Sequence, residues 1–365
     1  MWKWYNQINR IAKKTGPSGP AFFGFRTVAA RRAAPGQEGG NPMKKILVVG
    51  SINMDCVIRL PRRPRPGETV FCSTVSHVPG GKGANQAYAL GRMGTGVSLI
   101  GAVGQDEFGR ISLANLRAAG VDTTGVRVSA DEDTGRAFIE VEDDGQNSII
   151  VLGGANTHVT EQDLLAHEAL FDRCEALIMQ LETPLDTVTA AARLARRKGK
   201  LVLLDPAPAR PDLPAELLQC VDLLKPNETE LEIVSGLPAD TREQCIAAAR
   251  SLLDRGVGQV LVTLGARGSL LVTRDGELFV PARKVKAVDT TAAGDCFNAA
   301  FACRLERCTD ASGEPAGSLA GANYREALEF ATAAAAIAVT RPGAQSSIPS
   351  RDEVERSLAA PAGAD

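Results

Sequence analysis

The sequence predicts an α/β fold with a doubly wound, mostly parallel β-sheet flanked by helices, together with a small additional β-sheet. From residue 43 onward, short apolar runs alternate with segments of helical periodicity. The first run lies within residues 45–52 and is apolar until it reaches Gly50 and Ser51, as is typical of a parallel strand buried on both faces. Two pairs of segments with period-two alternation interrupt this order early in the chain.

The later strands of the large sheet follow the pattern of the first one. We expect them at residues 97–103, 176–179, 201–204, 223–224 and 260–264. Between them, residues 185–197 and 242–253 show helical periodicity. Because a helix that joins two strands returns the chain to the same end of the sheet, this alternation predicts parallel strands.

Two early hairpins are expected to form the small sheet. One pairs residues 56–60 with 69–78, and the other pairs residues 136–142 with 148–152 across a turn. We therefore expect lid strands inserted at about residues 56–78 and 125–152. A small sheet beside the carboxyl ends of the main strands would shield a bound substrate. Its exposed edges and apolar face also predict a homodimer formed through the lids.

The first 42 residues differ from the rest of the chain. They are basic, contain Glu38 as their single acidic residue, and end in a run rich in Gly and Pro. We expect residues 1–42 to form a disordered extension and residues 43–365 to form one folded domain. An organelle-targeting peptide is one account of the extension. An upstream start codon or an added leader sequence is another.

Composition excludes several classes of protein. The 365 residues carry 41 Lys and Arg against 43 Asp and Glu, a formal charge of -2, so the chain has no overall basic field to hold nucleic acid. The longest apolar stretch, residues 330–339, is roughly half the length that a membrane helix needs. Eight cysteines occur without a C-x-x-C pair, which argues against structural zinc and a disulfide framework. We expect a cytoplasmic protein.

A glycine-rich motif, Gly-Gly-Lys-Gly-Ala-Asn-Gln-Ala, occupies residues 80–87. Glycines at the start of a helix let its backbone approach a polar ligand, and Asn85 can donate hydrogen bonds to vicinal hydroxyls and accept them. The motif lacks the spacer and the terminal Lys-Ser/Thr of a Walker P-loop. For this motif alone, a tight strand-to-helix turn without a ligand is the alternative.

A second motif, Val-Asp-Thr-Thr-Ala-Ala-Gly-Asp-Cys-Phe-Asn, occupies residues 288–298 before an apolar helix that runs to about Leu305. Small residues at a helix start leave backbone N–H groups free to bind an anion. In the first turn, Asp295 could take a proton from a hydroxyl whose oxygen then attacks a phosphorus held by those N–H groups. Capping of the helix by Asp295 is the simpler alternative.

Three segments together resemble the ribokinase/phosphofructokinase-B family of ATP-dependent sugar and nucleoside kinases, namely residues 50–55, 80–87 and 289–295. The resemblance covers roughly residues 43–358. It implies a ribokinase-like fold and the ATP-dependent phosphorylation of D-ribose at its 5-hydroxyl, which gives ribose 5-phosphate and ADP. Deoxyribose and nucleoside kinases of the same family are alternatives, and a sugar sensor without catalytic activity is an alternative from a different class.

The resemblance also implies roles for individual residues. Asp295 would be the general base, and the backbone N–H groups of Ala293, Gly294 and Asp295 would stabilise the transferring phosphoryl group. Ala292 belongs to the same predicted catalytic loop. The sugar would contact residues near the two glycine-rich segments: Asn53, Met54, Asp55, Gly81, Lys82, Gly83, Ala84, Asn85, Glu182 and Asp295. ATP would contact a second set: Asn227, Thr263, Leu264, Gly265, Ala266, Arg267, Gly268, Gly294, Asp295 and Thr332.

Two metal ions are implied as well. A monovalent cation, K⁺, would be coordinated mainly by backbone oxygens of Asp289, Thr291, Ala338, Arg341, Gly343 and Ser347. Glu230 would hold the hydrated Mg²⁺ of MgATP, with a helix-surface charge as the alternative role for this residue. The sequence departs from the family pattern at Asp205, where Asn is frequent, and at Thr332, where His is frequent near the adenine.

Overall fold

The computed structural model describes residues 45–144, 146–305 and 323–359. The predicted extension, residues 1–42, lies outside the described residues. The large sheet has nine strands in the order β13-β12-β11-β10-β9-β8-β1-β4-β5. Their bounds are β1 Lys45–Val49, β4 Gly96–Gly104, β5 Val121–Ser129, β8 Ala176–Met179, β9 Leu201–Leu204, β10 Leu223–Leu224, β11 Gln259–Thr263, β12 Gly268–Val272 and β13 Glu277–Pro281.

The large sheet is parallel except at one edge, where β12 pairs antiparallel with both β11 and β13. This confirms the predicted doubly wound, mostly parallel architecture. The helices are α2 Lys82–Arg92, α3 Glu107–Ala118, α4 Glu161–Ala166, α5 Glu168–Arg173, α6 Leu185–Arg197, α7 Ala215–Cys220, α8 Glu228–Ser235, α9 Arg242–Asp254, α10 Ala293–Arg304, α11 Tyr324–Ala338 and α12 Arg351–Ala359. Short 3₁₀ helices are η1 Gly154–His158, η2 Gly265–Arg267 and η3 Gln345–Ser347.

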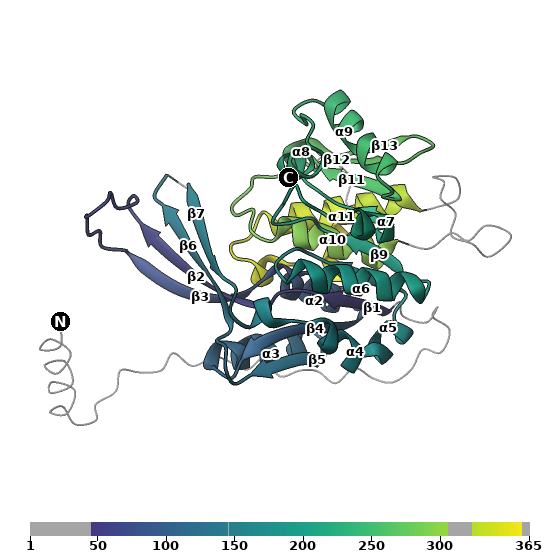
Figure 1. Cartoon of the computed structure of the whole chain (residues 1–365). Coiled ribbons are helices and arrows are strands. Elements are labelled where there is room, and N and C mark those ends of the chain that lie inside the picture. The colour runs from purple at the N-terminus through teal and green to yellow at the C-terminus, as the bar shows by residue number, and fades with distance from the viewer. Residues whose placement is uncertain (1–44, 145, 306–322, 360–365) are drawn as a thin grey trace, which may run out of the picture. The chain divides into compact units, whose positions relative to one another are not determined.

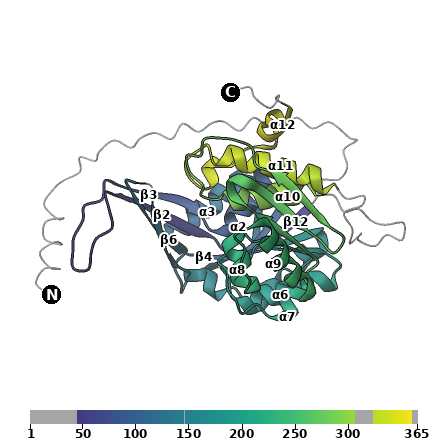
Figure 2. The same cartoon turned by 90° about the horizontal axis from the view of Figure 1, so that it is seen from above.

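Both faces of the large sheet are buried. Along β1, Ile46 and Val48 belong to one hydrophobic cluster, with α2, α10 and α11, whereas Leu47 and Val49 belong to another, with α6 and α9. Figure 2 shows α10, α11 and α12 on one side of the molecule and α6, α7 and α9 on the other. Side chains alternate between the faces of a strand, so a strand covered on both faces must be apolar at every position. This explains the uninterrupted apolar run of residues 46–49.

No helix of the described ranges is long and apolar enough to cross a membrane.

The small sheet contains four strands in the order β3-β2-β6-β7 and is set apart from the large sheet (Figure 1). It consists of two antiparallel pairs, β2 Asn53–Leu60 with β3 Thr74–Gly80 and β6 Gly135–Glu142 with β7 Asn147–Leu152, and β2 joins β6 in parallel. The two hairpins therefore occur as predicted. The predicted bounds need correction at three places. β2 begins at Asn53, and β3 spans Thr74–Gly80 rather than residues 69–78. Residues 125–129 end β5 and pair with β4 in the large sheet.

Candidate active site

Three adjacent parallel strands, β8, β9 and β10, are each followed by a polar residue. Gln180 comes directly after β8, Asp205 after β9 and Lys225 after β10. Since the carboxyl ends of parallel strands meet at one edge of a sheet, these residues lie side by side. The amino ends of α2 and α10 reach the same place, because Gln86 of α2 and Asn298 of α10 both hydrogen-bond Asp205.

The glycine-rich motif forms the start of α2. Gly81 has φ 88°, a left-handed conformation that favours glycine. A Cβ atom on Gly83 would lie 2.5 Å from the carbonyl carbon of Gly50, so only glycine lets α2 approach the end of β1 this closely. The backbone N–H of Lys82 donates to Glu182 Oε2 at 3.1 Å, and Ser51 Oγ donates to the same oxygen. The motif is thus a close helix–strand contact that also orients Glu182.

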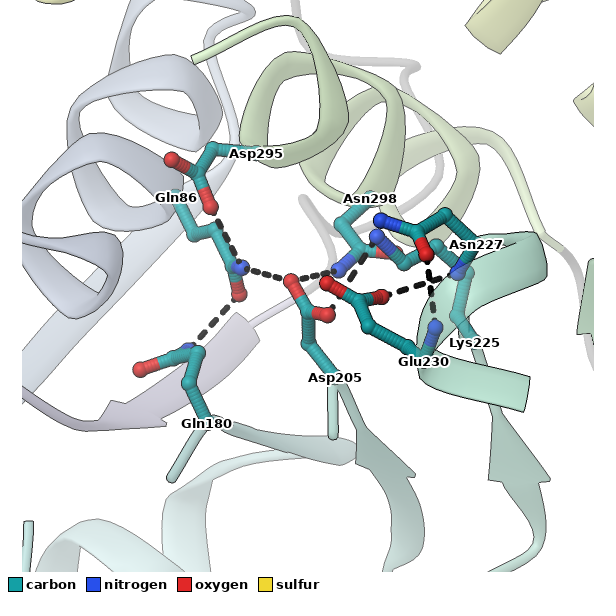
Figure 3. Close-up of polar contacts among 8 residues, drawn as sticks. All are labelled: Gln86, Gln180, Asp205, Lys225, Asn227, Glu230, Asp295 and Asn298. Carbon is teal, nitrogen blue, oxygen red and sulfur yellow. Dashed lines mark hydrogen bonds and ion pairs between the residues drawn. The ribbon is translucent and has the colours of Figure 1, made fainter. Parts of the chain in front are cut away.

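Asp295 is buried at the start of α10 and is held by two amides from α2. Asn85 Nδ2 donates to its Oδ2 at 3.0 Å. Gln86 Nε2 donates to its Oδ1 at 2.9 Å (Figure 3). Burial raises the pKa of Asp295 and the charge of Asp205 adds to this, while Lys82 and the two amides oppose it. The side chain does not hydrogen-bond its own helix terminus in the described structure. Asp295 therefore does not act as an N-cap.

The loop before α10 has an unusual backbone. Ala292 has φ 58°, and no other non-glycine residue in the described ranges has a positive φ. The N–H groups of Gly294 and Asp295 have no hydrogen-bond partner among the residues that the structure describes, whereas the N–H of Ala293 donates to Thr290 O at 3.2 Å. Unpaired N–H groups at a helix start attract an anion. Two of the three N–H groups predicted to bind the phosphoryl group are thus available in this conformation.

Asn53 and Asp55 lie at the start of β2, rather than at the end of β1. Asn53 Oδ1 accepts from Asn156 Nδ2 at 2.8 Å. Burial raises the pKa of Asp55 to about 7, and the negative charges of Glu182 and Asp295 contribute to the shift. These charges act on Asp55 only because the three carboxylates come together. Met54, which lies between these two residues in the chain, is also buried. Because side chains alternate along a strand, its side chain lies on the opposite face of β2.

The residues expected to contact ATP come from α8, the turn after β11, and α11. Asn227 and Glu230 form a capping box at the start of α8, in which each side chain accepts a hydrogen bond from the other residue's backbone N–H at 2.8 Å. Thr263 forms an isolated bridge with Asn227, and the turn from Leu264 to Gly268 closes with a hydrogen bond of 2.8 Å between these two residues. These segments are therefore adjacent.

Thr332 of α11 is 8% exposed, and its Oγ1 has no hydrogen-bond partner in the described structure. Arg267, in the turn before β12, pairs with Glu228 of α8. Both residues belong to the set of segments expected to bind nucleotide. A buried hydroxyl without a partner is costly, so Thr332 is a position where a ligand could supply one.

The two loops expected to bind K⁺ are tied together by Asp289. Its Oδ1 accepts from the N–H of Thr291 at 2.9 Å, and its Oδ2 accepts from the N–H of Gly343 at 2.8 Å. Burial opposes ionisation, but these bonds bring the pKa of Asp289 below its usual value. The backbone oxygens of Asp289, Thr291, Arg341 and Gly343 accept no hydrogen bond from the described residues. Such oxygens suit a large, weakly hydrated cation.

The chain matches the family described as pfkB family carbohydrate kinase over residues 43–351. It belongs to this family. A ribokinase from Haemophilus influenzae is 41% identical over 310 residues, which cover 85% of this chain and 97% of that protein. A deoxyribokinase from Salmonella typhi is 37% identical over 313 residues, covering 86% and 98%. The structure of Arabidopsis thaliana ribokinase complexed with ribose and ATP has a TM-score of 0.76 at 34% identity and covers 87% of this chain and 99% of its own.

These comparisons confirm the family predicted from the sequence and its ribokinase-like fold. The structure of this carbohydrate kinase also contains site residues that sequence reasoning did not assign. Gln86 links Asp295 to Asp205 and accepts from Gln180 at 2.7 Å. Gln345, next to the residues expected to bind K⁺, donates to Asn85 Oδ1 at 3.1 Å. Gln86 lies within a motif already singled out, so its position could have indicated a role, whereas only the fold brings Gln345 to Asn85.

Lys225 is a further residue to which the sequence analysis gave no role. It is 5% exposed, and its Nζ lies 3.3 Å from Asp205 Oδ1. Its place directly before the Pro-Asn pair of the expected nucleotide segment is a sequence signal. Asp205, noted from the sequence as a departure from the family pattern, thus has a lysine partner across the strand ends.

Proposed function

We propose that this carbohydrate kinase transfers the γ-phosphoryl group of ATP to the 5-hydroxyl of D-ribose. The observation that carries the proposal is the buried carboxylate of Asp295, held by Asn85 and Gln86 of the glycine-rich helix and placed beside unpaired N–H groups. The glycine-rich motif expected to bind the sugar and the loop expected to bind the phosphoryl group therefore meet at the carboxylate of Asp295. The ribokinase from Haemophilus influenzae, identical at 41% of aligned positions, supports ribose as the acceptor.

Asp295 would act as the general base. Its pKa is raised by burial, and a base is most effective when its pKa approaches the working pH. The carboxylate would take the proton from the 5-hydroxyl as that oxygen attacks the phosphorus. The N–H groups of Gly294 and Asp295 would bind the phosphoryl oxygens, and Asn53, Asp55 and Glu182 would hold the other sugar hydroxyls. Phosphoryl transfer depends chiefly on such positioning and charge stabilisation.

ATP would bind along Asn227, the turn at residues 263–268 and Thr332. The buried unpaired hydroxyl of Thr332 supports this placement. For Mg²⁺, Glu230 would act through a bound water. One of its oxygens, Oε2, already accepts from the N–H of Asn227, so the capping box orients the carboxylate while the metal water would use the other oxygen. When bound, Mg²⁺ neutralises charge on the β- and γ-phosphates.

K⁺ would bind between the two loops joined by Asp289. The unpaired backbone oxygens of Asp289, Thr291, Arg341 and Gly343 support this proposal. Ala338 and Ser347 complete the proposed set. The cation would hold the loop that carries the anion site, since Asp289 precedes that loop. We therefore expect turnover to be faster in KCl than in NaCl at equal ionic strength.

The test of the proposed function is ADP release from MgATP with ribose, 2-deoxyribose, fructose or adenosine as acceptor. We expect selective turnover of ribose. Asp295→Asn should lower kcat by at least about 100-fold while ribose binding, measured by calorimetry, persists. Asp352→Asn, which changes an Asp in the first turn of α12, is the matched control. Selective turnover of 2-deoxyribose would identify the enzyme as a deoxyribokinase, and binding of ribose without turnover would favour a sensor.

We also propose a homodimer formed through the small sheet. Its edge strand β7 exposes four consecutive apolar side chains, Ile149, Ile150, Val151 and Leu152, at 50–61%. A second copy could cover this apolar strand by an isologous contact. Ile150→Lys should convert a dimer to a monomer in light scattering, and Leu165→Lys on α4 should not. A wild-type monomer at micromolar concentration would refute this assembly.

We place the enzyme in the cytoplasm.

A further inference from the structure

Lys225 points its ammonium group at the anion loop. A Cβ atom built on Gly294 would lie 3.5 Å from Lys225 Nζ. The unpaired N–H of Gly294 belongs to the same short segment. Lys225 therefore stands next to the place where the proposed function puts the phosphoryl group, and the inference below rests on that function.

The side chain of Lys225 is mostly buried, and its ammonium group contacts one carboxylate without a hydrogen bond. Its side chain is 6% exposed and that of its partner Asp205 is 2% exposed. The two charges are 3.3 Å apart, yet Asp205 Oδ1 has no hydrogen bond in the described structure, so the contact is an ion pair without hydrogen-bond geometry. Among the described residues, Lys225 Nζ donates no hydrogen bond. An ammonium group has three donors, so anionic oxygens bound beside it could accept hydrogen bonds from Lys225.

The register of the sheet explains why the pair is placed here. Leu204 of β9 and Leu224 of β10 are neighbours, and the next residues in each strand are Asp205 and Lys225. The N–H of Lys225 donates to Leu204 O at 2.9 Å, which fixes its backbone. Asp205 is fixed in turn by Gln86 and Asn298, each at 3.0 Å (Figure 3). The lysine is thus held on rigid elements.

We propose that Lys225 binds the γ-phosphoryl group of ATP during transfer, together with the N–H of Gly294, and that Asp205 is a positioning residue for it. Phosphate oxygens would supply the acceptors that Lys225 lacks. The positive charge would be closest to the group that carries the developing negative charge. Asp205 balances the charge of the lysine when no phosphate is bound, so the site does not hold an isolated buried cation.

Calorimetric binding of nucleotides, with Mg²⁺ present and ribose absent, tests this proposal. Lys225→Met should weaken binding of a non-hydrolysable ATP analogue by about 10- to 100-fold, the effect of a lost charge-assisted hydrogen bond. Binding of ADP, which lacks the γ-phosphoryl group, should weaken by less than about threefold. Binding of ribose alone should not change. Lys45→Met, at the opposite end of β1 from the site, is the matched control.

Lys225→Met leaves Asp205 buried without its partner, so this variant could fail to fold. The double variant Lys225→Met/Asp205→Asn removes both charges, and the amide oxygen that it places at position 205 can still accept from Gln86 or Asn298. It should fold and show the same selective loss of the ATP analogue. An unchanged ratio of analogue to ADP affinity in the double variant would overturn the proposal.

These outcomes are separable from failure of the proposed function. If the wild-type enzyme phosphorylates an acceptor other than ribose, the analogue-to-ADP ratio still tests Lys225, because no sugar is present. A wild-type protein that binds no ATP analogue would overturn both the proposed function and the role of Lys225.

Discussion

The pKa of Asp55 predicts that ribose binding depends on pH near neutrality. Burial raises this pKa to about 7, with contributions from Glu182 and Asp295. An ionised carboxylate accepts hydrogen bonds from two sugar hydroxyls, whereas a protonated one accepts them less well. Below pH 7 the free protein holds a proton on Asp55, so ribose must bind the minority ionised form. The dissociation constant of ribose should therefore rise as the pH falls.

The magnitude follows from the fraction of ionised Asp55. With a pKa of about 7, that fraction falls from about 0.9 at pH 8 to about 0.1 at pH 6, so the dissociation constant should rise about tenfold. Calorimetry of ribose binding without nucleotide measures this directly. The charged groups that act on Asp55 are Glu182 and Asp295, and Lys82 interacts with both of them.

Two variants separate Asp55 from its neighbours. Asp55→Asn should weaken ribose binding at pH 8 and abolish the pH dependence. Asp295→Asn should keep the dependence and move its midpoint to lower pH, because one of the charges that raises the pKa of Asp55 is removed. A dissociation constant for the wild type that is flat between pH 6 and 8, or a dependence that persists in Asp55→Asn, would refute this reasoning.

Three further predictions concern the same site. The raised pKa of Asp55 destabilises the folded state as the pH rises from the pKa that this group has in the unfolded chain to about 7. Asp55→Asn should therefore increase the free energy of unfolding at pH 8, by about 4 kcal/mol at most. Chemical denaturation that shows no gain would contradict this. Gly80→Ala places a Cβ 2.1 Å from Asp55 Oδ2, so KM for ribose should rise at least about tenfold with little change in ATP-analogue binding. Asp289→Ala removes the link to Gly343 and should raise the K⁺ concentration for half-maximal activity, as a KCl titration would show; an unchanged titration would remove Asp289 from the cation site.

Much of the fold could be predicted from the sequence because its signals are local. An apolar run without alternation, such as residues 45–49, indicates a strand covered on both faces, and the two hairpins indicated a separate sheet. Strand boundaries were harder to predict. The start of β2 at Asn53 could not be read from periodicity, since Asn53 and Asp55 are buried polar residues of the site and break the apolar pattern that marks a strand.

Part of the candidate site could likewise be predicted from the sequence, and part of it could not. Roles for Asp295, for the glycines at residues 80–83 and for the expected nucleotide segment could be predicted because each motif is contiguous in the chain and resembles a known family. The network that joins them depends on distances between residues far apart in sequence, such as Gln86 to Asp205 and Gln345 to Asn85. No local pattern encodes such a distance.

The sequence by itself determined which strands are parallel and buried, which helix begins with glycines, and which carboxylate lies at the helix terminus that is expected to bind an anion. Only the tertiary structure decided the environment of each charge. Burial raises the pKa of Asp55 to about 7, and the charges of Glu182 and Asp295, which the fold brings close to it, add to the shift. Lys225 faces Gly294 because the register of β9 and β10 sets it beside Asp205. Burial and Coulomb energies depend on separations in space, and the chain acquires these separations only when it folds.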